Sequence, residues 1–348
     1  DKERVEELRN LLAEPRKIVI VGHTNPDGDA IGSSLALAEV LTARGHKVTC
    51  TLPNNYPYYL RWIPNSENII IYRNDEEHRT EKALDEADVI VCADMNSLTR
   101  ADALGEAVAK NTTAKRVLID HHLFPAEGFD IMFSYPESSS TAFLMYTIIE
   151  ALYGKEAITA TVATQLYVGI MTDTGNFSYN SNRPQIYPMI ASLIEAGVDK
   201  DAIYNAVFNQ YSVDRMKFVG YCLYQKMRVF PEHHAALIYL NRKELYRFNF
   251  QKGDAEGIVN MPLQSKDIHY SVFMREDKAT PDEMEKNGGI KTKIKLSFRS
   301  QGDRPVNVFA SEVFNGGGHA NAAGGEYYGT LAEAVQLFLD NYAKYFKA

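Results

Sequence analysis

The sequence has 348 residues, of which 45% are hydrophobic and 24% are charged, and it carries a net charge of −8. These values are typical of a globular protein that is not disordered, and the length is sufficient for two domains with separate cores. The negative charge argues against a protein that coats long nucleic acids, because such binding depends on neutralising many phosphates with Lys and Arg.

The cysteine pattern and the hydropathy indicate the compartment. Cys50, Cys92 and Cys222 are widely spaced and stand among apolar neighbours, which predicts buried thiols rather than disulfides. Such thiols are typical of a reducing environment. No apolar run reaches the roughly 20 residues that cross a bilayer. We therefore expect a cytoplasmic protein that does not bind membranes.

The first part of the chain alternates between helical and strand patterns. A helix over residues 3–13 is followed by a strand at 18–21, a helix at 30–44 and a strand at 47–52. A strand–helix–strand unit of this length implies a parallel sheet with a right-handed crossover. The elements expected next are a solvated helix within 74–88, a strand at 89–92, a helix at 101–110, a strand at 117–119, a helix from the cap at 138–141 through 152, and a helix at 159–171.

Beyond residue 198 the pattern changes. Residues 199–228 are helical in pattern and rich in aromatic side chains, and strands are expected at 235–240 and 291–300 before a last helix at 331–345. In the second strand the lysines alternate with apolar residues, so we interpret the lysine face as solvated. The sequence thus predicts an α/β fold: a catalytic domain at 1–198 with a parallel sheet and helices on both faces, a helical linker at 199–228, and a smaller α/β domain with a mixed sheet at 229–348.

Four apolar segments of the first domain lead directly into metal-binding residue types. In open parallel sheets the ligand crevice lies at the carboxyl ends of the strands, so we expect all four segments to occupy equivalent positions around one site. The residues concerned are His23, Asp27 and Asp29 after the strand at 18–21, Asp94 after 89–92, Asp120, His121 and His122 after 117–119, and Asp173 after the apolar segment 166–171.

Each group has a structural alternative. An Asp at a helix start is commonly an N-cap, which would explain Asp27 and Asp29 without a metal. A surface turn explains Asp120-His121-His122 less well, because titratable residues that end a buried strand are costly unless paired or metal-bound. Imidazoles mixed with carboxylates favour Mn²⁺ over Mg²⁺, and a pair of ions suits a phosphoester.

A second candidate site lies in the C-terminal part. Gly316, Gly317 and Gly318 precede His319, and glycine-rich loops let backbone amides approach phosphate oxygens closely. The alternative is a flexible turn. Arg299 lies shortly before the glycines, and Arg100 follows Asp94; the forked guanidinium of either residue suits phosphate.

In their order along the chain, these residues resemble the motifs of the DHH phosphoesterase superfamily. They are the motif His23-x-x-x-Asp27-x-Asp29, Asp94, Asp120-His121-His122 and Asp173. The Gly316–His319 segment with Ala322-Ala323-Gly324 resembles the substrate-binding loop of the DHH-associated C-terminal domain. The resemblance covers essentially the whole chain. It is strongest to the NanoRNase type, oligoribonucleases that also remove phosphate from 3′-phosphoadenosine 5′-phosphate (pAp). RecJ nucleases share the motifs but are usually longer.

The resemblance implies a role for each residue. One metal ion would be held by His23, Asp27, Asp94 and Asp173, and the other by Asp29, Asp94, His121 and Asp173. His122 would face the scissile phosphate, and Asp120 would orient its neighbours. The residues that would grip a second substrate phosphate are Arg299, Gly316, Gly317, Gly318 and His319, assisted by Arg100.

The activity expected from this resemblance is hydrolysis of short oligoribonucleotides to mononucleotides and dephosphorylation of pAp. It would use two Mn²⁺ ions, with Mg²⁺ as the alternative cation. The partners would be short RNA and a nucleoside 3′,5′-bisphosphate, not long duplexes. Alternatives are hydrolysis of cyclic di-AMP or its linear product, inorganic pyrophosphatase activity, and a non-catalytic nucleic-acid-binding scaffold. The oligomeric state is left open.

Overall fold

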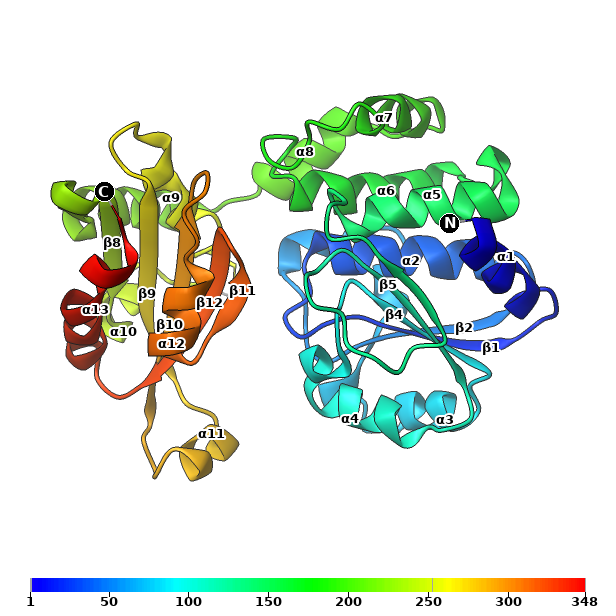
Figure 1. Ribbon diagram of the computed structural model, residues 1–348, viewed down its shortest axis with the longest axis horizontal. Helices are drawn as coiled ribbons and strands as arrows, with labels where there is room; N and C mark the ends of the chain where they lie inside the picture. The colour runs from blue at the N-terminus through cyan, green and yellow to red at the C-terminus, as the bar shows by residue number, and fades with distance from the viewer. Residues whose placement is uncertain (1, 252, 348) are drawn as a thin grey trace. The chain divides into compact units, whose positions relative to one another are not determined.

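The computed structural model describes residues 2–251 and 253–347, and the chain forms two compact units, residues 1–210 and 211–348 (Figure 1). Each unit contains one six-stranded sheet. The boundary between the units falls inside the segment 199–228, where α8 (Lys200–Phe208) and α9 (Val213–Tyr221) lie on either side of it.

The sheet of the first unit is entirely parallel. Its strand order is β3-β2-β1-β4-β5-β6, so the chain builds outward from β1 to β3 and then returns to place β4 beside β1. This reversal between β1 and β4 is the position at which open α/β sheets bind ligands. The strands are β1 (Lys17–Val21), β2 (Lys47–Leu52), β3 (Ile70–Ile71), β4 (Val89–Ala93), β5 (Lys115–Asp120) and β6 (Ile131–Ser134).

Helices cover both faces of this sheet, as predicted (Figure 1). On β1, Ile18 and Ile20 belong to the core on one face, whereas Val19 and Val21 belong to the core on the other. This double burial explains why the strands are continuous apolar runs. The helices of the first face are α1 (Lys2–Leu11), α2 (Gly28–Thr42), α5 (Thr141–Tyr153) and α6 (Ala160–Asp173), those of the second are α3 (Arg79–Asp85) and α4 (Asp102–Lys110), and α7 (Ile186–Glu195) follows α6.

Helices α2 and α6 are packed unusually closely. A Cβ on Gly32 of α2 would lie 2.3 Å from the Gln165 carbonyl oxygen, and a Cβ on Gly169 of α6 would lie 2.5 Å from the Ala142 Cβ and 3.0 Å from an Asp29 carboxylate oxygen. Glycine is therefore required at Gly32 by the approach of one backbone to another, and at Gly169 by the side chains of Ala142 and Asp29. The contact fixes the distance between two helices that both carry predicted metal ligands at their ends.

The second unit has the predicted mixed sheet, in the order β11-β12-β10-β9-β8-β7. Only β8 and β9 are parallel among its neighbouring pairs of described strands. Its strands are β7 (Arg228–Phe230), β8 (Ala235–Leu240), β9 (Tyr270–Lys278), β10 (Thr292–Ser300), β11 (Gly317–His319) and β12 (Ala322–Tyr328), and its helices after α9 are α10 (Arg242–Arg247), α11 (Pro281–Lys286), α12 (Asn307–Phe314) and α13 (Leu331–Tyr345).

The two faces of this second sheet are covered differently. Helices α12 and α13 pack on one face, where Leu296 and Phe298 of β10 join Phe338. On the other face α9 and α10 pack over β8 and β9, through Phe218, Ile238 and other apolar residues. The same face of β10 carries alternating Lys, Ser and Arg side chains.

The lysine face of β10 was predicted to be solvated, and this is wrong for Lys293. Its side chain is buried and forms ion pairs with Glu283 of α11 and with Glu326 of β12. A buried ammonium is tolerated only when it is paired in this way. The pairs hold α11 near the end of the β9–β10 hairpin, from which it protrudes (Figure 1).

Two sequence-based expectations about the whole chain can be compared with the structure. All three cysteines are buried and free, as predicted. Within the described ranges, no helix combines the length and apolar character that crossing a membrane requires.

The α2–α6 contact predicts an unusual response to a conservative substitution. We expect Gly32→Ala to destabilise the protein by about 1–3 kcal/mol, because the added methyl group overpacks a backbone contact that cannot yield. Chemical denaturation followed by circular dichroism measures this loss.

The matched control is Gly220→Ala, on helix α9, where an added Cβ would meet no atom within 4 Å. There the substitution should stabilise by about 0.4–1 kcal/mol, because alanine restricts the unfolded chain. Equal effects at the two positions would contradict the packing argument.

Candidate active site

The predicted metal ligands of the first unit meet in one cluster. Their potential ligand atoms form three groups, within each of which all atoms lie within 4.8 Å of one another. Asp94 belongs to two of these groups and His121 belongs to two, so the groups interlock rather than standing apart. The groups are Asp94, His121 and His122; His23, Asp27 and Asp94; and Asp29, His121 and Asp173.

The carboxyl ends of the central strands supply most of this cluster. His23 follows β1, Asp94 follows β4, and Asp120 ends β5 immediately before His121 and His122. Asp27 is the N-cap of α2, where its carboxylate accepts hydrogen bonds from the backbone N–H groups of Asp29 (2.9 Å) and Ala30 (3.1 Å). The capping interpretation of Asp27 is thus correct as well, and it does not compete with the cluster.

Asp173 reaches the cluster from the end of a helix, whereas the other predicted ligands follow strands. The helix predicted at 159–171 is confirmed as α6, and Asp173 is its last residue. The expectation that the end of this segment is equivalent to the strand ends is wrong. The Asp173 carboxylate nevertheless lies 3.6 Å from the Nε2 atom of His121.

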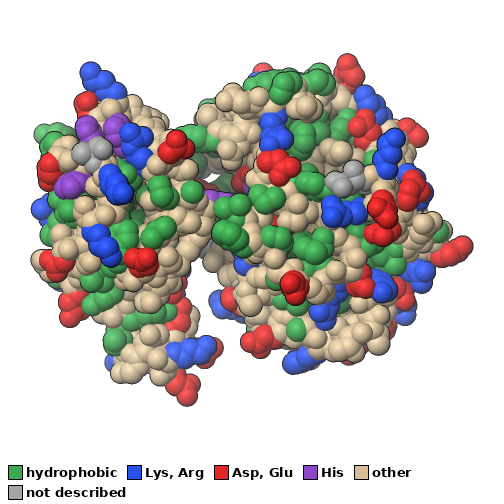
Figure 2. Space-filling model, viewed as in Figure 1, with side chains coloured by type: hydrophobic (Ala, Val, Ile, Leu, Met, Phe, Trp, Pro, Cys, Tyr) green, Lys and Arg blue, Asp and Glu red, His purple; other side chains and the backbone are tan. Residues whose placement is uncertain are grey.

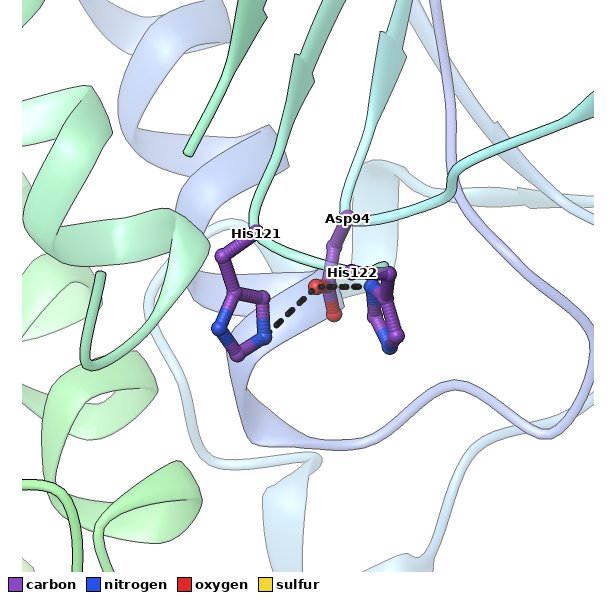
Figure 3. A group of neighbouring side chains, drawn as sticks. All are labelled: Asp94, His121 and His122. Carbon is purple, nitrogen blue, oxygen red and sulfur yellow. Dashed lines mark ion pairs between the residues drawn. The ribbon is translucent and has the colours of Figure 1, made fainter. Parts of the chain in front are cut away.

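Asp94 is the centre of the cluster. Its Oδ2 atom lies 3.4 Å from Nε2 of His23, and its Oδ1 atom lies 3.7 Å from both Nε2 of His121 and Nδ1 of His122. Figure 3 shows the two imidazoles on either side of the Asp94 carboxylate. The backbone of Asp94 has a φ of +59°, a left-handed conformation that costs a non-glycine residue about 1–3 kcal/mol. A hydrogen bond from its N–H to the Ile119 carbonyl (2.9 Å) helps to hold this conformation.

The hydrogen bonds of two histidines leave one ring nitrogen directed at the cluster. The Nδ1 atom of His23 lies 2.9 Å from the Thr24 carbonyl oxygen, and Nδ1 of His121 lies 3.2 Å from the Ser138 carbonyl oxygen. A carbonyl oxygen can only accept, so Nδ1 carries the proton, and a neutral ring then presents the lone pair of Nε2. This is the arrangement that metal-binding histidines adopt.

His122 is oriented by its neighbour Asp120. The fully buried Asp120 carboxylate lies 2.7 Å from Nδ1 of His122 and accepts a hydrogen bond from the His122 backbone N–H at 3.0 Å. Two contacts from one carboxylate fix both the backbone and the ring. The ring of His122 is thereby held in one orientation beside Asp94.

Helix α5 contributes to the site in a way that sequence reasoning missed. The Asp29 carboxylate accepts hydrogen bonds from the backbone N–H groups of Thr141 (2.7 Å) and Ala142 (2.8 Å), and the Thr141 hydroxyl donates to Asp94 at 3.0 Å. The run 138–141 was recognised only as a helix cap. Nothing local in the sequence indicates that the first N–H groups of this helix are directed at Asp29, although a helix N-terminus favours negative charge.

Burial and mutual repulsion disfavour the ionisation of two carboxylates of the cluster. Burial raises the pKa of Asp29, and the charges of Asp94 and Asp173 raise it further. Burial also raises the pKa of Asp173, together with the charges of Asp27 and Asp94. Three acidic groups that oppose each other's ionisation can be satisfied by protons or by divalent cations, and at neutral pH a cation is the better partner.

Asp94 and the histidines show the opposite tendency. Burial alone would raise the pKa of Asp94, but the hydrogen bond with His23 and the three nearby imidazoles lower it below its usual range. Burial would lower the pKa of His23 and of His121, but the Asp94 carboxylate outweighs burial and raises both. Asp94 is therefore the group that stays ionised at the centre of the cluster.

Besides His122, the predicted phosphate-binding residue of this unit is Arg100. It is partly buried, its positive charge lowers the pKa of His23, and its Nη1 atom is buried without a hydrogen-bond partner among the described residues. A buried guanidinium N–H without an acceptor is costly. A phosphate oxygen close to His23 would supply the missing acceptor.

The predicted glycine-rich loop of the second unit is a hairpin of β11 and β12. A Cβ on Gly316 would lie 1.9 Å from the Gly324 carbonyl oxygen, and one on Gly318 would lie 2.5 Å from that of Ala322. Close backbone approach within the hairpin therefore explains these two glycines structurally. Gly317 is exposed, and a Cβ there would meet nothing within 4 Å.

The hairpin nevertheless places two predicted substrate-binding side chains together. Arg299 of β10 and His319 of β11 are both in register with Ala322 of β12, which lies between them. Side chains in register project from the same face of a sheet, so a guanidinium and an imidazole flank one small residue. Two strand spacings, about 10 Å, separate them.

Comparison with known proteins is consistent with this geometry. Residues 17–170 match the family model described as the DHH family, N-terminal domain, and residues 235–348 match the DHHA1 domain. The chain is similar to a crystal structure of an exopolyphosphatase-related protein from Bacteroides fragilis, at 41% identity and a TM-score of 0.91, with 99% of this chain and 97% of that chain covered.

More distant relatives have names that describe an activity. A protein of Thermus thermophilus named bifunctional oligoribonuclease and PAP phosphatase NrnA is 27% identical over 96% of this chain and 93% of its own length. A protein of the same name from Mycoplasma genitalium is 26% identical over 93% of this chain and 92% of its own. A structure of RecJ in complex with Mn²⁺ from Thermus thermophilus shares the fold, with a TM-score of 0.54 at 13% identity over 99% of this chain and 54% of that one. The chain belongs to the DHH family, and it carries the N-terminal DHH domain together with a DHHA1 domain.

Proposed function

We propose that the protein is a phosphoesterase that uses two Mn²⁺ ions to hydrolyse short oligoribonucleotides to mononucleotides and to remove the 3′-phosphate of pAp. The observation that carries this proposal is the interlocking of three groups of potential metal ligands through Asp94 and His121. Interlocked groups are what a pair of neighbouring cations requires, because at least one ligand must serve both. The relatives named oligoribonuclease and PAP phosphatase support the choice of substrates.

The proposed cation sites are those that the family resemblance implies. His23, Asp27, Asp94 and Asp173 would hold one ion, and Asp29, Asp94, His121 and Asp173 would hold the other. The mixture of imidazoles and carboxylates favours Mn²⁺, with Mg²⁺ as the alternative. When bound, two such ions supply Lewis-acid polarisation of the phosphoryl group and a nucleophilic water at neutral pH.

The remaining residues act on the substrate. His122, held by Asp120, would donate a hydrogen bond to the scissile phosphate and stabilise the charge that develops on its oxygens. Arg100 would bind the same phosphate through its unsatisfied guanidinium N–H. In the second unit, Arg299 and His319 would bind the other phosphate of the substrate, and the exposed backbone of Gly317 lets that phosphate approach the strand.

Surface charge supports a preference for short substrates. On the face shown in Figure 2, basic and acidic side chains are interspersed rather than gathered in a track of one sign. With a net charge of −8, the protein offers little general attraction to a long polyanion. Affinity would come instead from a few phosphate contacts, which a dinucleotide or a bisphosphate already satisfies. The cytoplasm remains the predicted location.

A substrate panel tests the proposal most directly. We expect the purified protein with Mn²⁺ to hydrolyse an RNA dinucleotide and pAp much faster than an RNA 24-mer or cyclic di-AMP. Product identification by chromatography would show mononucleotides from the dinucleotide and AMP with free phosphate from pAp. Faster turnover of cyclic di-AMP than of both preferred substrates would reject the proposed specificity and favour the cyclic-dinucleotide alternative.

Metal binding should stabilise the first unit strongly, because cations relieve the repulsion between buried carboxylates. Mn²⁺ at a hundred times its dissociation constant adds about 2.7 kcal/mol per site. For a unit of this size, that corresponds to a rise in Tm of about 5–10 °C for one site. Differential scanning calorimetry with and without EDTA measures the shift.

The matched variant for this experiment is Asp94→Ala, which removes the shared ligand. It should abolish most of the Mn²⁺-dependent stabilisation and lower kcat by more than about a hundredfold, because even residues behind metal ligands typically contribute 10–100-fold. A variant that kept both the thermal shift and the activity would show that Asp94 does not bridge the ions.

Arg299→Ala should act on substrate binding rather than on the chemical step. A charge-assisted hydrogen bond to phosphate is worth about 1.5–3 kcal/mol, so KM should rise by tenfold or more while kcat changes little. Lys295→Ala is the control, because Lys295 lies on the same strand and face and also carries a positive charge. A similar rise in KM for both variants would indicate a general charge effect instead of a specific phosphate contact.

A further inference from the structure

The loop that follows His122 presents an aromatic ring to solvent. Phe124 is 82% exposed, and it makes no ring contact with any residue that the structure describes. Its backbone has a φ of +59°. A bulky residue pays a conformational cost in this left-handed region, where glycine would not. The ring therefore contributes nothing visible to packing, and its backbone is strained.

Hydrogen bonds from Asn96 hold the loop in this conformation. The Asn96 side-chain amide donates to the carbonyl oxygens of Leu123 (2.7 Å) and Phe124 (3.4 Å), and its backbone carbonyl accepts from the Ala126 N–H at 2.7 Å. Asn96 stands two residues after Asp94, so the loop is tied to the segment that carries the central carboxylate. Phe124 itself stands two residues after His122, and two residues span at most about 7 Å.

A strained residue that is held in place by its surroundings points to a role in ligand binding when it lies at a functional site. Phe124 lies two residues after His122, and its loop is hydrogen-bonded to Asn96, two residues after Asp94. The ligand that an exposed, rigidly held aromatic ring beside a phosphate-binding group fits best is a nucleobase, since every base has a face that stacks on such a ring.

We propose that Phe124 is a stacking platform for the base of the nucleotide whose phosphate lies at His122. This inference rests on the proposed function and deepens it, because it explains how the site would recognise a nucleotide without reading its sequence. Stacking discriminates weakly among bases, so the subsite would accept all four, with purines bound more tightly than pyrimidines. Phosphoesters that carry no base would bind without this contribution.

The test compares substrates with and without a base. Phe124→Gly should lower kcat/KM for pAp by about 5- to 100-fold, the loss expected for removing one stacked base. Hydrolysis of ribose 3′,5′-bisphosphate, which lacks the base, should be unchanged. Phe124→Tyr should retain the wild-type preference for pAp, because tyrosine also offers a ring for stacking.

Two measurements separate this role from a structural one. The Tm of Phe124→Gly should equal or exceed that of the wild type, because glycine relieves the positive φ. The fluorescence of 2-aminopurine ribonucleoside 5′-monophosphate, titrated with Mn²⁺ present, should be quenched on binding to the wild type and to Phe124→Tyr, and much less on binding to Phe124→Gly. Tyr187→Ala, which removes another exposed ring from the first unit, is the control and should change neither measurement.

The outcomes are distinguishable. An equal loss on both bisphosphates, or a clear fall in Tm, would overturn the stacking role and leave the proposed function standing. Unchanged turnover of pAp by Phe124→Gly would also overturn it. A wild-type protein that hydrolyses neither compound but still quenches 2-aminopurine through Phe124 would support the subsite and reject the proposed function.

Discussion

The main physical constraint on this structure is the repulsion among carboxylates that the fold places together at the carboxyl edge of the parallel sheet. Asp29, Asp94 and Asp173 are held in a region from which water is largely excluded, and burial makes the ionisation of each more costly. The chain offsets this cost only in part, through imidazoles around Asp94 and through the N-terminus of helix α5. The negative charge that is not offset favours the binding of positive charge at the cluster. A site of this kind is stable in its working state, with cations bound, and strained without them.

The residues and backbone groups that form the cluster at this edge come from distant parts of the sequence. Asp29 and the N–H group of Thr141 are separated by 112 residues, yet they form one of the short hydrogen bonds of the site. The hydrophobic cores on the two faces of the sheet fix the strands, and the strands fix the residues that follow them. The positions of the side chains in the cluster are therefore determined by packing elsewhere in the unit. That packing imposes local strain on the left-handed backbone of Asp94.

Much of this organisation could be predicted from the sequence, because its signals are local. Continuous apolar runs indicated the parallel strands, and the residue types that follow them indicated metal ligands. The errors concern contacts between distant segments. The end of helix α6 was expected to be equivalent to a strand end, and Lys293 is buried because its partners lie on α11 and β12. The contact of helix α5 with Asp29 could likewise not be predicted from the sequence. The sequence pattern of a helix cap is the same whether the first N–H groups of the helix face water or a carboxylate.

The close contact of helices α2 and α6 has a consequence for the kind of ion that the cluster accepts. Gly32 of α2 lies against the Gln165 carbonyl of α6, and Asp29 and Asp173 stand on these same two helices, so main chain against main chain sets the separation of the two carboxylates. Such a spacer is far stiffer than a pair of flexible side chains. A cation held by both residues would therefore have to match a spacing that the backbone sets.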